Sequence, residues 1–324
     1  MSAGTHWRPG ASPERLRLRA ALLARARRFF AARQVLEVDT PVVVGAPVSD
    51  VHIHSATVQL EGPGAAAQYF LHTSPEYAMK RLLAAGSGDI YQICHVARGF
   101  ESGAVHNSEF TLIEWYRIGF TLGQLMDEVE ALVRELIGPA AAQLAGERLS
   151  YREAFLRTLR VDPFSAATAQ LERAARSAGF TAAPADRDEC LELLMGTVIG
   201  PQLGAQALTC VHGYPASQAA LARLDPHDPR AAQRFELYCR GIELANGFHE
   251  LAAASEQRAR FEADQAERRR RGLAVHPLDE RLLAALAHGL PDCCGVALGF
   301  DRVLMLAAGA ARIEEVLPFT TPDA

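Results

Sequence analysis

The stretch G-V-A-L-G-F-D-R, at Gly295–Arg302 near the C-terminus, decides how this chain is interpreted. Its V-A-L-G segment is predicted to be a short strand, and Arg302 falls at the start of a helix predicted over 301–309. An arginine at such a corner can lay its guanidinium on an aromatic ring, although Arg302 alone could equally pair with Asp301. The stretch therefore predicts a strand followed by a helix, with a ligand-binding position at their junction, where glycines leave room beside the backbone.

A second stretch, R-F-E-L-Y-C-R-G-I-E-L-A-N-G-F-H-E at residues 234–250, spaces Glu236, Glu243 and Glu250 evenly by seven. In a single helix the three carboxylates would form a solvated stripe, and spacing alone leaves that interpretation open. The aromatic-rich flanks and the Asn246-Gly247 pair favour a strand, a turn and a second strand.

In the strand interpretation, convergence of the carboxylates depends on a turn. Residues seven apart on one strand point to opposite faces, so Glu236 and Glu243 need a turn at Arg240-Gly241, which glycine permits. Converged carboxylates suit Mg²⁺, which prefers oxygen ligands and shares them with substrate phosphates. We therefore predict Glu236 and Glu243 as metal ligands and Glu250 as free for an ammonium, a combination that suits ATP, Mg²⁺ and a cationic substrate.

The composition is that of an ordinary globular protein, with 49% apolar and 22% charged residues over 324 positions. The formal charge of −5 argues against a broad nucleic-acid surface. No apolar run is long enough to span a membrane, and the N-terminus lacks an apolar signal core. The six cysteines form no C-x-x-C pair, which predicts reduced thiols in a cytoplasmic protein. Lys80 is the only lysine, which GC-rich coding explains most simply.

The order of predicted elements points to an α+β fold. Strands gather at 35–120 and 207–300, joined by hairpin-like loops, which predicts one antiparallel sheet flanked by helices rather than a doubly wound α/β sheet. An Ala/Leu-rich stretch at about 160–205 is predicted to be a helical insertion in a single domain covering 1–324. Helices are predicted over 13–34, 121–138, 150–158, 252–272, 279–288 and 301–309.

Individual residues in the first half carry weaker signals. Arg98 follows a strand and could fork onto a phosphate, although alone it could be a surface arginine. Phe110 could face Arg302 across an adenine, or could belong to the core. Glu76 follows Pro75 at a helix start, with Ser74 as the cap, and could bind an amine or simply complement the helix dipole. The hydroxyl of Tyr116 points into a cleft or caps the core.

Together these motifs resemble the catalytic core of class II aminoacyl-tRNA synthetases of the lysyl type. The first helix with the strand ending at Pro41 resembles motif one, Tyr91–Arg117 resembles motif two, and Gly295–Arg302 resembles motif three. T-S-P-E-Y-A-M-K-R-L-L and G-I-E-L-A-N-G-F-H-E-L look specific to the lysyl type. Because the chain begins at motif one, without an anticodon-binding barrel, it is most similar to the elongation factor P lysine ligase family.

The resemblance implies a role for each matching residue. Arg98 would bind the α-phosphate of ATP, and Phe110 and Arg302 would enclose the adenine, so both arginines would be catalytic. ATP would be bound by Arg98, Gly99, Phe100, Asn107, Phe110, Glu243, Leu244, Gly299 and Arg302. The amino acid would be bound by Ser74, Pro75, Glu76, Tyr116, Glu250 and Ala297. Mg²⁺ would be bound by Glu236 and Glu243.

The implied activity is ATP-dependent ligation in translation. The resemblance implies that (R)-β-lysine or lysine is activated as an aminoacyl-adenylate and transferred to the ε-amine of a lysine on elongation factor P, by a cytoplasmic homodimer. Ala297 stands where lysyl synthetases have glycine, which fits a preference for β-lysine, and the motif-two loop departs from the family at Phe100, Ala104, Val105 and Ser108. Two alternatives stay open, a non-catalytic regulatory paralogue and a free-standing ligase acting on tRNA or a small molecule. The acidic charge and missing anticodon module argue against tRNA.

Overall fold

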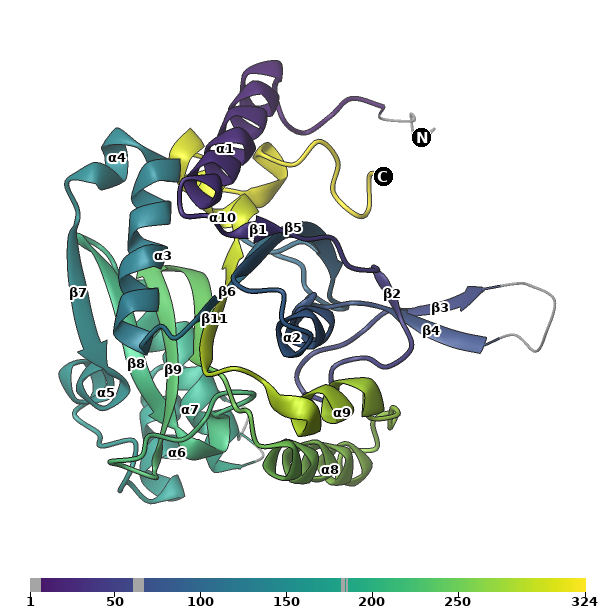
Figure 1. The fold of residues 1–324 in the computed structure, drawn as a ribbon. Coiled ribbons are helices and arrows are strands. Elements are labelled where there is room, and N and C mark those ends of the chain that lie inside the picture. Colours follow the sequence, from purple (N-terminus) through teal and green to yellow (C-terminus); the bar gives the residue numbers. More distant parts are fainter. Residues whose placement is uncertain (1–6, 61–66, 182–183, 185) are drawn as a thin grey trace, which may run out of the picture.

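A computed structural model describes residues 7–60, 67–181, 184 and 186–324, and Figure 1 shows their arrangement. A large sheet forms the centre, with the strand order β1-β5-β6-β11-β10-β9-β8-β7. Its six inner strands pair in antiparallel fashion, whereas β1 with β5 and β7 with β8 are parallel. The α+β prediction is confirmed, with parallel pairs added at both edges. The strands are β1 (Leu36–Glu37), β5 (Ile90–Ala97), β6 (Glu109–Ile118), β11 (Cys293–Gly299), β10 (Ile242–His249), β9 (Ala231–Cys239), β8 (Ala207–Pro215) and β7 (Ala145–Ser150).

Three helices cover one face of this sheet: α1 (Pro13–Ala31), α3 (Leu122–Ile137) and α10 (Phe300–Ala308). Each begins where the sequence supplies a start signal, as at Thr121, which forms a capping box with Gln124. The apolar stripe of α3 packs against Trp115 of β6 in the main core. Asp301 of α10 connects this helical layer to the sheet, because it accepts a 2.7 Å hydrogen bond from the Thr111 N–H of β6 and pairs with Arg19 of α1.

The opposite face carries α2 (Glu76–Ala84), α8 (Ala254–Arg270) and α9 (Glu280–Gly289). Strand alternation divides the two cores, since Trp115 belongs to the first and its neighbour Tyr116 to the second. Met79 and Leu83 of α2 pack there with Leu282 of α9. On this second face of the sheet, side chains from β6, β10 and β11 therefore lie beside α2.

A small second sheet pairs β2 (Val43–Val44) with β4 (Ala67–Leu71), and β4 with β3 (Thr57–Leu60). The sequence predicted a strand that ends at Pro41 in this region. Instead the chain leaves the large sheet after Glu37 and enters the small one after Pro41, where proline has no N–H to continue a ladder.

The stretch predicted as an insertion contains α6 (Thr168–Ser177), α7 (Arg187–Leu194), a π-helical turn (Met195–Ile199) and a 3₁₀ turn (Gly200–Gln202). These pack with α5 (Tyr151–Leu159) around their own apolar cluster, against Tyr214 and Tyr238 of the sheet. Its separation as an insertion in one domain stays a prediction. Shorter elements are α4 (Pro139–Ala142) and the 3₁₀ turns Ala216–Gln218 and Ile313–Glu315. No helix among the described residues is long and apolar enough to cross a membrane.

Candidate active site

A cavity of about 780 Å³ opens on the sheet face beside β6, β10 and β11. Its volume lies within the range of about 300–1,000 Å³ found for small-molecule sites. Twelve of the residues predicted from the sequence line it: Ser74, Glu76, Arg98, Asn107, Phe110, Tyr116, Glu243, Leu244, Glu250, Ala297, Gly299 and Arg302. Four others are placed differently. Pro75 lines a neighbouring cavity, Gly99 packs on His54, Phe100 is 88% exposed and Glu236 is buried behind the wall.

Two backbone features bring the evenly spaced glutamates together. Arg240 and Gly241, both with positive φ, form the tight turn between β9 and β10, where the sequence required one. A bulge between Glu243 and Ala245 then shifts the strand by one residue. Because of this bulge, Glu243 and Glu250 line the same cavity despite their odd separation. Asn246 and Gly247 lie inside β10 and form no turn.

The strand register sets the order of side chains across the site. Ala297 of β11 lies opposite Asn246 of β10 on one side and Glu114 of β6 on the other. Gly295 lies opposite Tyr116 in the same way. A Cβ on Gly295 would lie 2.5 Å from Glu250 Oε1 and would overlap the Tyr116 ring. Glycine is therefore required at 295 for Tyr116 and Glu250 to meet over this strand.

One end of the cavity is a cluster of carboxylates. The hydroxyls of Ser74 and Tyr116 each donate a 2.7 Å hydrogen bond to Glu114. Ser74 also accepts from the Glu76 N–H at 3.0 Å, but α2 begins at Glu76 with Pro75 as its N-cap, so the prediction of Ser74 as the cap is wrong by one residue. Lys80 Nζ lies 2.7 Å from Glu76 Oε1 and 2.6 Å from Glu250 Oε2. This end can receive cationic groups.

Burial changes the protonation of these carboxyls. Burial, reinforced by Glu76, raises the pKa of Glu114 to about 7. Burial also raises the pKa of Glu250 to about 8, although Lys80 opposes the shift. A bound ammonium would favour the ionised forms, so the cluster is adapted to exchange protons for a cationic ligand near neutral pH.

The other end of the cavity carries the two predicted arginines. Arg302 is fixed by the Val105 carbonyl at 3.2 Å and the Glu243 carbonyl at 2.9 Å. The alternative partner of Arg302, Asp301, is instead paired with Arg19. Arg98 donates to the Thr73 carbonyl at 3.1 Å, and its guanidinium lies 5.1 Å from the Phe110 ring centroid. Both arginines are thus held at the wall by backbone oxygens, with aromatic surface beside them.

His106 is a further contact of Arg302 that the sequence did not reveal. Its Nε2 lies 2.6 Å from Arg302 Nη2. Because an arginine nitrogen only donates, this Nε2 accepts and the imidazole is neutral. Burial, followed by the charge of Arg302, lowers the pKa of His106 and keeps it neutral. Asn107, next in the chain, uses its side-chain amide to donate to the Glu109 carbonyl at 2.6 Å.

The two predicted metal ligands differ in how far they are available. Glu243 is half-exposed in the cavity, with Arg302 Nη1 3.9 Å from its Oε2. Glu236 accepts from the hydroxyls of Tyr214 at 2.5 Å and Tyr238 at 2.6 Å, and pairs with Arg234 at 2.5 Å. Glu243 therefore fits Mg²⁺ as a carboxylate ligand, whereas Glu236 already has protein partners for both oxygens. Among the described residues no group of three His, Cys, Asp or Glu side chains is placed to hold a metal ion.

Several site residues were missed by the sequence reasoning. Glu114 could have been found, because it stands two residues before Tyr116 on a strand and shares its face. Lys80 stands one helical turn after Glu76, a spacing that places both on one side of α2. Arg234 could have been found in the same way, because it stands two residues before Glu236 on β9, whereas His106 gave no signal, since its partner Arg302 comes from another segment of the chain.

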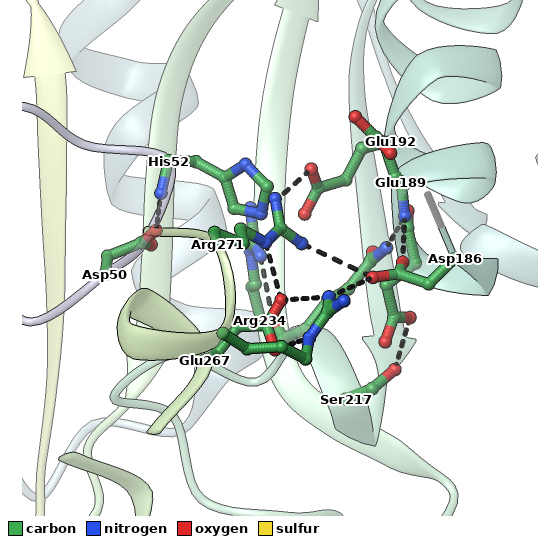
Figure 2. A network of polar contacts seen from close by, with 12 residues as sticks. Asp50, His52, Asp186, Glu189, Glu192, Ser217, Arg234, Glu267 and Arg271 are labelled. Atoms are coloured by element: carbon green, nitrogen blue, oxygen red, sulfur yellow. Dashed lines mark hydrogen bonds and ion pairs between the residues drawn. The ribbon is translucent and has the colours of Figure 1, made fainter. Parts of the chain in front are cut away.

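A polar network spans the mouth of the cavity, and Figure 2 shows it. His52 lies 3.7 Å from Glu192 of α7, and Arg271 lies 3.3 Å from Asp186 and 2.5 Å from Glu267 of α8. Ser217 donates to Asp188 at 2.6 Å. The network connects the loop at 48–53, α7 and the end of α8, all of which line the outer cavity.

The fold and the site together define a class of protein. A family model described as "tRNA synthetases class II (D, K and N)" matches residues 5–322. The chain therefore belongs to this class II tRNA synthetase family. Within that family it belongs with the elongation factor P–(R)-β-lysine ligases, as the resemblance in the sequence indicated.

Three relatives with that name establish this membership. The ligase of Vibrio cholerae is 50% identical, with 98% of each chain covered. The ligase of Vibrio parahaemolyticus is 49% identical over 99% of each chain, and that of Edwardsiella ictaluri is 48% identical over the full length of both. The predicted family and fold are thus confirmed.

Proposed function

We propose that this protein is an ATP-dependent ligase that activates (R)-β-lysine or lysine as an aminoacyl-adenylate and transfers it to the ε-amine of a lysine on elongation factor P. The observation that carries the proposal is the division of one cavity into two ends. Arg98 and Arg302 stand at one end, and the carboxylates Glu76, Glu114 and Glu250, of which Glu114 and Glu250 are buried, stand at the other. The names of the relatives supply the protein acceptor.

The residues suggest how each step is supported. The carboxylate cluster would hold the two ammonium groups of the amino acid, so its carboxyl group points along β11 toward the arginines. Arg98 would neutralise the α-phosphate of ATP, and Arg302 with Phe110 would hold the adenine, while the substrate carboxylate attacks the α-phosphate and pyrophosphate leaves. Mg²⁺, bound through Glu243 and the phosphates, would offset further negative charge. The acceptor lysine would then attack the adenylate carbonyl and release AMP.

The amino acid preference is proposed to depend on Ala297. Its methyl group lies between Asn246 and Glu114, at the floor of the cavity. A methyl at this point reduces the room beside the carboxylate cluster, which supports a preference for the β-amino acid. Ala297→Gly is expected to raise pyrophosphate exchange with α-lysine relative to β-lysine.

We also propose a homodimer in the cytoplasm. The edge strand β1 exposes Leu36 by 54%, and Val42 just beyond it is 43% exposed. An unpaired edge with exposed apolar side chains is typical of a surface that a second copy covers. A translation factor as substrate supports the cytoplasmic location.

The test combines two assays on purified protein. ATP–pyrophosphate exchange with α-lysine, (R)-β-lysine and norleucine reports activation, and intact mass of elongation factor P reports transfer. The proposal expects exchange with a diamino acid and a mass increase of one aminoacyl group on the factor. No exchange with any amino acid would favour a regulatory paralogue, and charging of bulk tRNA at physiological salt would favour a free-standing synthetase.

A further inference from the structure

Lys80 is a charged side chain that neither the predicted site nor the fold explains. Of the 33 lysine and arginine residues in the chain it is the only lysine. It lies in α2, between the buried residues Met79 and Leu83, and is 1% exposed. A side chain as long and polar as lysine is rarely buried unless its ammonium is paired.

The ammonium of Lys80 joins two carboxylates that come from different parts of the chain. Nζ lies 2.7 Å from Oε1 of Glu76, on its own helix, and 2.6 Å from Oε2 of Glu250, just after β10. Both glutamates line the cavity, whereas Lys80 stands behind them. Burial alone would lower the pKa of Lys80, but Glu250 and Glu76 outweigh burial and raise it, so the ammonium stays charged.

The charge of the cluster can be counted. Glu76, Glu114 and Glu250 carry three negative charges when ionised, and no other basic side chain of the described residues is ion-paired with them besides Lys80. Two negative charges therefore remain, which is the number that the two ammonium groups of a diamino acid neutralise. The other ionisable groups that interact with these carboxylates are Tyr77, Cys94, Tyr116, Cys293 and Cys294, and burial raises the pKa of each, so they stay neutral.

The choice of lysine fits this role better than arginine. An ammonium is compact and presents three donors in any direction, whereas a guanidinium is a wide planar fork. Behind the cavity wall, Lys80 meets one oxygen from each of two carboxylates, from separate directions. An arginine with its fork would push one carboxylate forward into the cavity.

We propose that Lys80 is a positioning and specificity residue, a built-in ammonium that orients Glu76 and Glu250 and leaves the pocket two negative charges for a diamino acid. This proposal rests on the proposed function, in which these glutamates receive the amino groups of the substrate. It predicts that Lys80 controls amino acid affinity and its proton balance without touching the ligand.

Calorimetry of lysine and (R)-β-lysine binding, at a series of pH values around neutrality, tests the proposal. Lys80→Met keeps the length of the side chain and removes the charge. Without the ammonium, the pKa of Glu250 rises further and one carboxyl of the cluster stays protonated in the complex, so the pH at which binding tightens moves upward. Affinity for the diamino acid is expected to fall at least about tenfold, a weakening that corresponds to loss of one charge-assisted contact. The affinity for ATP is expected to stay the same.

Two control variants separate charge from packing. Leu83→Ala removes a buried side chain from the same helix, so it lowers the melting temperature without moving the pH profile of binding. Lys80→Arg keeps the charge, so it retains the wild-type pH profile while weakening binding. Equal affinity and the same pH profile in Lys80→Met and wild type would overturn the role of Lys80. Failure of the wild-type protein to bind any diamino acid would instead overturn the proposed function and this role with it.

Discussion

Gly295→Ala is the substitution whose effect the structure defines most sharply. The new Cβ would lie 2.5 Å from Glu250 Oε1 and 2.5 Å from Tyr116 Cδ1, well inside the 3.0 Å that real Cβ contacts respect. Neither of these two side chains has room to move away from the new methyl group. Tyr116 is 2% exposed with its hydroxyl bound to Glu114, and Glu250 is 4% exposed beside Lys80.

The magnitude follows from what must move. Overpacking a tight core by one methyl costs about 1–3 kcal/mol, so the melting temperature is expected to fall by several degrees. If the ring swings away, its hydrogen bond to the Glu114 carboxylate is lost, and the ammonium of the substrate loses an oriented partner. A hydrogen bond to a charged group contributes about 1.5–3 kcal/mol, so amino acid affinity is expected to fall about 10- to 150-fold.

The assay is calorimetric titration of (R)-β-lysine into the wild type and the variant, with scanning fluorimetry for stability. Gly299→Ala is the matched control on the same strand, because the nearest atom to its Cβ would be Arg302 Cδ at 3.6 Å, an ordinary contact. It is expected to keep amino acid affinity and to weaken ATP binding instead. A Gly295→Ala protein that is folded and binds the amino acid as tightly as wild type would refute the reasoning.

Four further predictions concern the two metal candidates, the carboxyl cluster and the exposed sheet edge. Glu243→Gln is expected to leave the melting temperature nearly unchanged and to reduce pyrophosphate exchange at least about a hundredfold. Glu236→Gln is expected to lower the melting temperature by several degrees, because Arg234 then loses its buried carboxylate; equal melting temperatures would contradict this contrast. Because the pKa values of Glu114 and Glu250, about 7 and 8, lie above the unfolded value of about 4.3, their contribution to stability is full below that value and is lost as the pH rises to between 7 and 8. The melting temperature of the free protein should thus decline from about pH 5 to 8 and level off above, while lysine binds more tightly, and flat profiles would argue against it. Leu36→Arg on the exposed β1 edge is expected to give monomers in sedimentation velocity, and an unchanged dimer mass would exclude that edge as the interface.

Local signals in the sequence located most of the helices and strands correctly. Ser12-Pro13 begins α1, Thr121 begins α3, and the strands around the motif-two loop follow their alternation. The small sheet was not foreseen, because β2 has two residues and β3 four, too short to show a period. The parallel edge pairs were missed because β1 and β7 find their partners far along the chain.

The candidate site was predicted in part, by motifs rather than by geometry. The glutamates were recognised from their spacing, yet their convergence depends on the bulge after Glu243, which no spacing rule reveals. The two metal candidates look identical in sequence. Only the arrangement of β8 and β9 shows that the hydroxyls of Tyr214 and Tyr238 donate hydrogen bonds to Glu236, while Glu243 faces the cavity.

The sequence by itself determined the class of protein and the residue types at its site, because motif identity is a local property of the chain. The sequence alone was enough to identify the glutamates at fixed intervals, the two arginines and the glycines on one strand. The tertiary structure decided which charges meet, because electrostatic partners are set by distance in space. Lys80 shows this most clearly. In the sequence it is the one lysine left by an arginine-rich composition, and in the fold it is the buried cation between Glu76 and Glu250.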